Sequence, residues 1–311
     1  MWEQRTELNT TVCRMSLSAH NVLEFWTHEV PLTLFIILAA FLYFRGWLRV
    51  HSAGLGTFAA WRAGSFCLGL MLIWIAIGSR LASLDHQLLT AHMIQHLLLM
   101  TLAPALILLG EPMQVLWYGV PKFGRVALRL VFQKPIVRRL ATVLIKPGLC
   151  WTVSAVTLIG WHLPMVFTMG MHSEVWHAAE QSSFLGAGFL FWWPVIRPWP
   201  STVSPRWSTI IYLFLATLPC DILSGFLVFC DRVVYTEHLS TLKEFGVYAL
   251  EDQQRAGALM WTCVTVVYLV AAAIVAVRLL SVRSGEENEP SQPEMAATVA
   301  AGAGPQSVEV G

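Results

Sequence analysis

Two histidines, His92 and His96, stand within a stretch that is otherwise apolar enough to cross a membrane, "HMIQHLLLMTLAPALILLG" (92–110). A spacing of four residues places both side chains on the same face of a helix. Ionisable groups are costly in lipid and usually face the interior of a helix bundle or a water-filled cavity. Because imidazole is a common ligand of copper, zinc and iron, the pair predicts part of a metal or haem site.

Two later stretches add similar groups. His162 lies in "WHLP", and Pro164 lacks the backbone N–H that a continuous helix needs, so a kink is expected there. The segment "HSEVWHAAEQ" places His177, Glu180 and Gln181 on one face of the first two turns of the next predicted helix. We therefore expect a metal site whose ligands are His92, His96, His162 and His177.

Other polar residues near these positions are expected to support the site. Carboxylates often orient metal-bound imidazoles by accepting their second N–H. Asp85 precedes His92 and His96 by 7 and 11 residues, so it shares their face if the helix extends that far. Asp221 follows Pro219 in another apolar stretch, where a charge requires a partner. The expected accessory residues are Asp85, His86, Glu180, Gln181, Asp221, Asp252 and Gln253.

The elements that must position these residues are membrane-spanning helices. The chain is 56% hydrophobic, and its 13% share of charged residues is about half that of a soluble domain. Several apolar runs approach the ~20 residues that cross a bilayer as a helix. The sequence predicts an all-α, polytopic membrane protein with seven transmembrane helices at about 30–48, 62–82, 87–109, 148–170, 174–196, 208–230 and 254–280.

Lys and Arg are distributed unevenly over the predicted links. The link 111–146 carries seven of them against one acid, Glu111, whereas the link after the fourth span has none. The positive-inside rule then places the N-terminus outside and the C-terminus in the cytoplasm. Nine of the ten histidines fall on the outer side. The predicted divisions are an extracytoplasmic segment 1–28, a seven-helix domain 29–283 with the basic cytoplasmic link 111–146, and a disordered cytoplasmic tail 284–311.

Within that link, "RVALRLVFQKPIVRRL" (125–140) is predicted to form a surface helix. Its alternation of basic and apolar residues favours contact with anionic headgroups of the lipid bilayer over docking of a partner protein.

Several function classes find no support. The six cysteines form no CxxC pair or disulfide framework, and residues 1–27 lack the features of a signal peptide. No Walker A loop, GxGxxG or HExxH motif is present, and nothing indicates nucleic-acid binding. We expect no enzyme activity.

Two alternatives to a metal-handling site stay open at this point. A b-type cytochrome could ligate haem through His96 and His162, which lie at comparable depths on adjacent spans. A proton or metal-ion transporter could use Asp221, Glu180 and the histidines as a relay. The transporter would need a polar path through the inner half of the bundle, where "LLLMTLAPALILLG" and "PGLCWTVSAV" are nearly all apolar.

At these residues the chain resembles the seven-span CtaG proteins, which are assembly factors for the caa-type cytochrome c oxidase of bacteria. The resemblance covers about residues 30 to 280. The similar segments, in family order, are "HMIQHLLLMTLAPALILLGEP", "WHLP", "HAAEQSSFLGAGFLFWWPVI", "IYLFLATLP" and "EDQQRAGALMW".

The resemblance implies a multi-pass protein of the bacterial plasma (inner) membrane that helps to form active haem–copper oxidase by handling copper. Its implied partners are oxidase subunits and a periplasmic copper chaperone. The family's motif positions fall on His92, His96, His162, His177, Glu180, Asp252 and Gln253. One departure is Gln181, where family members often carry histidine; because an amide is a poor copper ligand, a site that relies on this position would be weakened or differ in geometry.

Overall fold

The computed structural model describes residues 30–52, 59–196, 207–237 and 247–287, with side chains described up to Ser281 at the C-terminal end. Within these ranges the chain forms helices and no strand, as the sequence predicts. The predicted segment 1–28 lies outside the described residues, as does almost all of the predicted tail 284–311.

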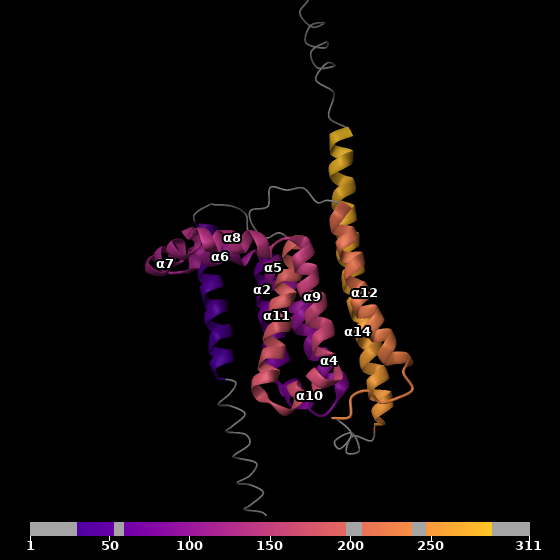
Figure 1. The fold of residues 1–311 in the computed structure, drawn as a ribbon. Coiled ribbons are helices and arrows are strands. Elements are labelled where there is room, and N and C mark those ends of the chain that lie inside the picture. The colour runs from indigo at the N-terminus through magenta and orange to yellow at the C-terminus, as the bar shows by residue number, and fades with distance from the viewer. Residues whose placement is uncertain (1–29, 53–58, 197–206, 238–246, 288–311) are drawn as a thin grey trace, which may run out of the picture.

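Most of the chain runs in long helices along one direction (Figure 1). In chain order these are an N-terminal helix Val30–Ser52, α2 (Ala60–Gly78) with α3 (Arg80–Leu84), α4 (Leu89–Leu97) continuing through the π-helical turn η1 (Leu98–Leu102) into α5 (Ala103–Leu109), α9 (Pro147–Trp161) with α10 (Pro164–His172), α11 (Glu174–Ile196), α12 (Trp207–Phe229) and α14 (Ala249–Glu287). Three shorter helices follow α5, namely α6 (Pro112–Gly119), α7 (Lys122–Gln133) and α8 (Pro135–Leu144).

Five helical segments of the described chain are long and apolar enough to cross a membrane, and a sixth is added if the bent pair α8–α9 counts as one span. The five are Val30–Ser52, Ala60–Leu84, Leu89–Leu109, Trp207–Phe229 and Ala249–Ser281. Large apolar side chains such as Phe35, Phe214 and Ile222 are exposed on their outer faces, where lipid would cover them. The chain is thus a membrane protein with several spans, while the count of seven spans and the orientation of the termini stay predictions.

The predicted fourth span is two helices rather than one. α9 ends at Trp161 and α10 begins at Pro164, because proline fits the first helical turn but cannot continue a preceding helix. His162 therefore lies at the break, where its own carbonyl accepts a hydrogen bond from the Tyr235 hydroxyl at 2.7 Å. The kink that the sequence predicts is thus a complete break between two helices, and it fixes the position of the His162 imidazole.

α4 starts without a capping side chain of its own, since Leu88 occupies the N-cap position. Asp252 of the neighbouring helix α14 supplies the cap. Its Oδ2 accepts from the Leu89 N–H at 2.7 Å, and its Oδ1 accepts from the Thr90 hydroxyl at 2.6 Å. This contact fixes the start of the helix that carries His92 and His96.

α11 contributes side chains to both apolar cores of the bundle. Phe184 and Ala187 belong to a core with the N-terminal helix, α2 and α5, whereas Phe191 and Trp192 belong to a core with α12 and α14. Gly188 lies against η1, where an added Cβ would be 2.4 Å from the Met100 carbonyl oxygen. This close approach holds α11 beside the helix that contains the two histidines.

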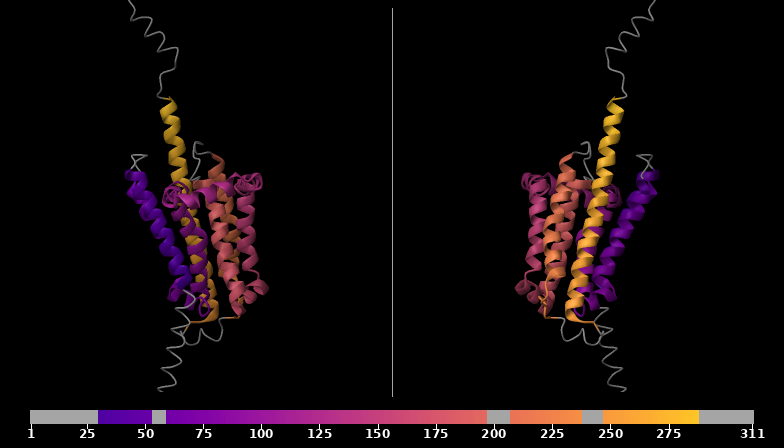
Figure 2. Two further views of the ribbon diagram at one scale, coloured as in Figure 1. Left: turned by 90° about the vertical axis from the view of Figure 1, so that its left-hand side faces the viewer. Right: turned by 90° about the vertical axis from the view of Figure 1, so that its right-hand side faces the viewer.

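The two ends of the bundle differ in construction (Figures 1 and 2). α6, α7 and α8 lie across one end, roughly perpendicular to the long helices. α10 and the start of α4 lie at the opposite end. The basic link 111–146 and His92, near the start of α4, therefore lie at opposite ends of the bundle.

Candidate metal site

Three ligand-type atoms meet inside the bundle at the α10 end. The Nε2 atoms of His92 and His96 are 2.7 Å apart, and they lie 3.5 and 3.2 Å from Oε1 of Glu180. All three side chains are buried. The histidines come from successive turns of α4 and the carboxylate comes from α11, so the packing of these two helices creates the group.

The contact between the two imidazoles restricts their protonation. An N···N distance of 2.7 Å is a hydrogen bond, so one Nε2 must donate and the other must present a lone pair. The Nδ1 atoms of His92 and His96 are buried and make no hydrogen bond within the described chain. The Nε2 atoms of both rings are directed at one another and at Glu180, where a cation could replace the shared proton.

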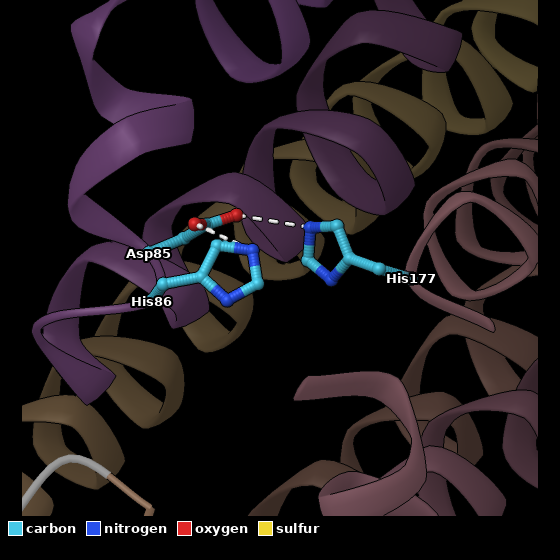
Figure 3. Close-up of side chains that lie close together, drawn as sticks. All are labelled: Asp85, His86 and His177. Carbon is cyan, nitrogen blue, oxygen red and sulfur yellow. Dashed lines mark hydrogen bonds and ion pairs between the residues drawn. The ribbon is translucent and has the colours of Figure 1, made fainter. Parts of the chain in front are cut away.

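Figure 3 shows a second group of polar side chains, Asp85, His86 and His177. It adjoins the first group, since the ring centroids of His177 and His92 are 5.9 Å apart. His177 Nε2 lies 3.0 Å from Asp85 Oδ2, and His86 Nε2 lies 3.7 Å from Asp85 Oδ1. Asp85 is fully buried in the turn between α3 and α4, whereas His86 is about half exposed. Burial by itself raises the pKa of Asp85, but the hydrogen bond with His177 and the charges of both histidines outweigh it and lower the pKa below its ordinary value.

The expected helical stripe of Asp85, His92 and His96 does not form, because α4 begins only at Leu89. Asp85 instead reaches the site from a separate turn, through its contact with His177.

Glu180 connects the two groups. Its Oε1 faces His92 and His96, while its Oε2 lies 3.5 Å from Nδ1 of His177. Gly170 of α10 leaves room for this carboxylate, since an added Cβ there would be 2.9 Å from Oε2. The sequence predicts that Glu180 orients the histidines, and its two oxygens lie within 3.5 Å of a nitrogen of His92, His96 and His177.

His162 stands beside the group rather than in it. Its ring centroid is 6.1 Å from that of His96, its Nδ1 lies 2.7 Å from the Leu158 carbonyl oxygen, and its Nε2 lies 3.3 Å from the sulfur of Met93. Sequence reasoning did not single out Met93 or Tyr235, although Met93 adjoins His92 in the same motif. An imidazole next to a thioether offers a softer pair of ligands than the neighbouring group.

The remaining accessory residues fall into three situations. The Nε2 atom of Gln181 lies 2.6 Å from the Nε2 atom of His177, so Gln181 belongs to the second group. Asp252 caps α4, and Gln253 Oε1 accepts from the Val234 N–H at 2.7 Å, so both hold backbone segments in place. Asp221 has a buried Oδ1, and the described residues show no contact between Asp221 and the histidines.

The residues present fit a small metal ion. Three ligand atoms about 2.0 Å from one ion are about 3.3 Å apart when the geometry is tetrahedral. The observed separations of 2.7, 3.2 and 3.5 Å approach this triangle without movement of the helices. Both His92–His96–Glu180 and Asp85–His86–His177 have ligand atoms within 4.8 Å of one another. The first set is fully buried, so it is the better protected from solvent.

Comparison with known proteins assigns the family. Residues 41–281, which include every residue of both groups, match the family model described as cytochrome c oxidase caa3 assembly factor. Neither the curated proteins nor the solved structures provide a match. With most of its length covered by that family model, the chain belongs to the cytochrome c oxidase caa3 assembly factor family.

Proposed function

We propose that this protein binds copper transiently in the buried His92–His96–Glu180 group and passes it on during assembly of the oxidase. The observation that carries the proposal is the convergence of two imidazole Nε2 atoms and one carboxylate oxygen at a buried point. The family supplies the client, since its members are named as assembly factors for cytochrome c oxidase caa3. Copper is then the cargo of the site rather than a resident cofactor.

The flanking residues support transfer of an ion as well as its binding. His177 lies between the buried group and the half-exposed His86, with ring centroids 5.0 Å from His86 and 5.9 Å from His92. His162 and Met93 lie on the other side of His96 and offer a thioether, which suits Cu(I). In the proposal, His177 and His162 extend the ligand set in these two directions, and Asp85 orients His177.

A haem site receives less support. The cavity next to His96 and His162 has a volume of about 40 Å³, which holds a few water molecules and is far smaller than a macrocycle. Ligation of one haem iron by both rings would require the bundle to open. The visible absorbance spectrum of protein expressed with haem available decides between the two. The copper proposal predicts no Soret band, and the haem alternative predicts one.

A transport path also receives less support. The buried acidic residues and histidines of the described chain are Asp85, His92, His96, His162, Glu180 and Asp252. Beyond this layer, towards α6, the buried polar side chains include Thr101 and Ser154, and Ser154 is already bonded to the Cys150 and Ala187 carbonyls. The polar layer is therefore one-sided, as a site that exchanges its ion at one membrane face requires.

Copper binding by the purified protein tests the proposal. We expect the wild-type protein to bind Cu(I) or Cu(II), and a His92→Ala/His96→Ala variant to lose this binding. His172→Ala is the matched control, because that histidine is 66% exposed and pairs with Glu237 away from the group. Unchanged copper binding in the double variant would sink the assignment of the site.

Gly170→Ala tests the role of the carboxylate without removing a ligand. The added methyl group must displace Oε2 of Glu180, so copper affinity should fall about tenfold, as it does when an outer-shell partner of a ligand is disturbed. In bacteria that lack the endogenous factor, the same variants should lower oxidase activity and the copper content of the purified oxidase in parallel. Full oxidase copper with the double variant would refute delivery even if the site binds metal.

A further inference from the structure

A basic pocket lies at the opposite end of the bundle from the histidines. It has a volume of about 480 Å³ and is lined by Arg45, Arg49, Tyr118, Pro121, Lys122 and Arg125. Two of these residues belong to the N-terminal helix, and the others belong to the segment from α6 to α7. Four cationic side chains from distant parts of the sequence therefore surround one space.

The described residues do not neutralise these charges. No salt bridge in the described chain involves Arg45, Lys122 or Arg125, and Arg49 donates a hydrogen bond to the carbonyl oxygen of Tyr118. The one acid of the basic link, Glu111, is paired with Arg62 of α2. Like charges this close repel one another, so the pocket favours an anion.

The packing beneath the pocket is tight enough to fix its shape. The N-terminal helix and α6 touch through two glycines. An added Cβ at Gly46 would be 2.0 Å from the Val115 carbonyl oxygen, and one at Gly119 would be 1.9 Å from the Leu42 carbonyl oxygen. Because only glycine permits this approach, Arg45 and Lys122 are held on adjoining backbones rather than on mobile surface segments.

The surroundings of the pocket are apolar. Phe123, next to Lys122, is 88% exposed, and Val126 and Leu130 are also exposed along α7. α7 lies across the end of the bundle, as a helix in the plane of a membrane surface does (Figure 1). A ligand in the pocket therefore contacts cationic side chains, and exposed apolar side chains of α7 lie beside them.

We propose that this pocket binds the phosphate headgroup of an anionic phospholipid, with Arg45 and Arg125 on the phosphate and the acyl chains along the N-terminal helix and α7. Arg is suited to phosphate because its planar group donates two parallel hydrogen bonds. The apolar flank distinguishes a lipid phosphate from soluble phosphate, which would gain nothing from Phe123.

Lipid binding by the full-length protein in detergent tests the proposal. Phosphatidylglycerol, phosphatidylcholine with the same chains, and soluble glycerol phosphate are added separately, and bound lipid is counted by native mass spectrometry. We expect phosphatidylglycerol to bind selectively, and an Arg45→Gln/Arg125→Gln variant to lose affinity about tenfold or more. An Arg45→Lys/Arg125→Lys variant, which keeps the charge, should recover much of that loss.

The matched control is Arg80→Gln/Arg232→Gln, which removes the same charge from two exposed residues outside the pocket. It should leave phosphatidylglycerol binding unchanged. An equal loss in this control would show a general charge effect and overturn the site, and equal binding of glycerol phosphate would overturn the lipid assignment. A second measurement uses the wild-type protein alone and identifies the lipid that it retains after washing. Retention of phosphatidylcholine in an amount equal to that of phosphatidylglycerol would also refute the proposal.

Discussion

The two ends of the bundle treat charge in opposite ways. At the α10 end, Glu180 contacts His92, His96 and His177, and Asp85 contacts His86 and His177, so each carboxylate lies beside imidazoles. At the α6–α8 end, four cations surround the basic pocket, and none of the residues that line it is acidic. The first group is buried and the second is open to its surroundings.

The difference follows from the medium around each group. A buried charge in a bundle has no water to stabilise it, so its partner must come from the protein. A charge at the membrane surface can take its partner from outside, as a phosphate or a counterion. Paired buried groups should therefore matter for stability, whereas unpaired surface cations should matter for what the protein binds.

The largest effect is expected from Glu180→Ala. This change leaves three histidines without their shared carboxylate in a buried site, and breaking such a pair costs about 3–5 kcal/mol. The thermal unfolding temperature in detergent should fall clearly, and copper binding should weaken with it. Glu180→Gln, which keeps the shape and an acceptor oxygen, should lose less stability than Glu180→Ala. A Glu180→Gln variant as stable as the wild-type protein would mean that the charge is unimportant.

Gly119→Ala should come next. Its methyl group would meet the Leu42 carbonyl oxygen, so the N-terminal helix must move away from α6 at a cost of about 1–3 kcal/mol. The same movement should weaken binding of phosphatidylglycerol to the basic pocket while copper binding is kept. Gly148→Ala is the control, because nothing lies within 4 Å of the added atom. A normal unfolding temperature for Gly119→Ala would contradict the close packing.

Asp252→Ala should have an effect of about 1 kcal/mol, since it removes the cap on α4 but leaves every histidine in place. Asp252→Asn should retain part of the cap. The measurement is again the unfolding temperature, with copper affinity as a second readout. A complete loss of copper binding with unchanged stability would instead place Asp252 among the ligands.

The smallest effect on stability is expected from Arg125→Gln. Substitutions of surface charges that have no partner usually change stability by less than about 0.5 kcal/mol. Arg125 forms no salt bridge with the described residues, so the unfolding temperature in lipid-free detergent should not change, although lipid binding should weaken. A marked loss of stability here would remove the contrast between the two ends.

The helical class, most span positions and the pairing of His92 with His96 could be predicted, because each depends on local periodicity and composition. The contacts between distant segments could not. The approach of Met93 to His162 depends on a helix break, and the approach of Arg45 to Lys122 depends on two glycines that are 73 residues apart. Spacing within a helix reveals which residues share a face, but it does not reveal which face of another helix they meet.

The π-helical turn η1 lets the two parts of one long helix, α4 and α5, pack against different neighbouring helices. A π turn takes in more residues than an α turn, so it offsets the angular phase of α5 relative to α4; one residue of an α-helix corresponds to about 100° of rotation. α4 packs on α14 and directs its histidines at α11, while α5 places Ala103 and Ile107 against Gly69 of α2. Removing a single residue from η1 would keep every ligand but change the angle between α4 and α5. The contacts of the histidines with Glu180 and of α5 with α2 could then not both be kept, so the length of this turn matters to the site as the imidazoles do.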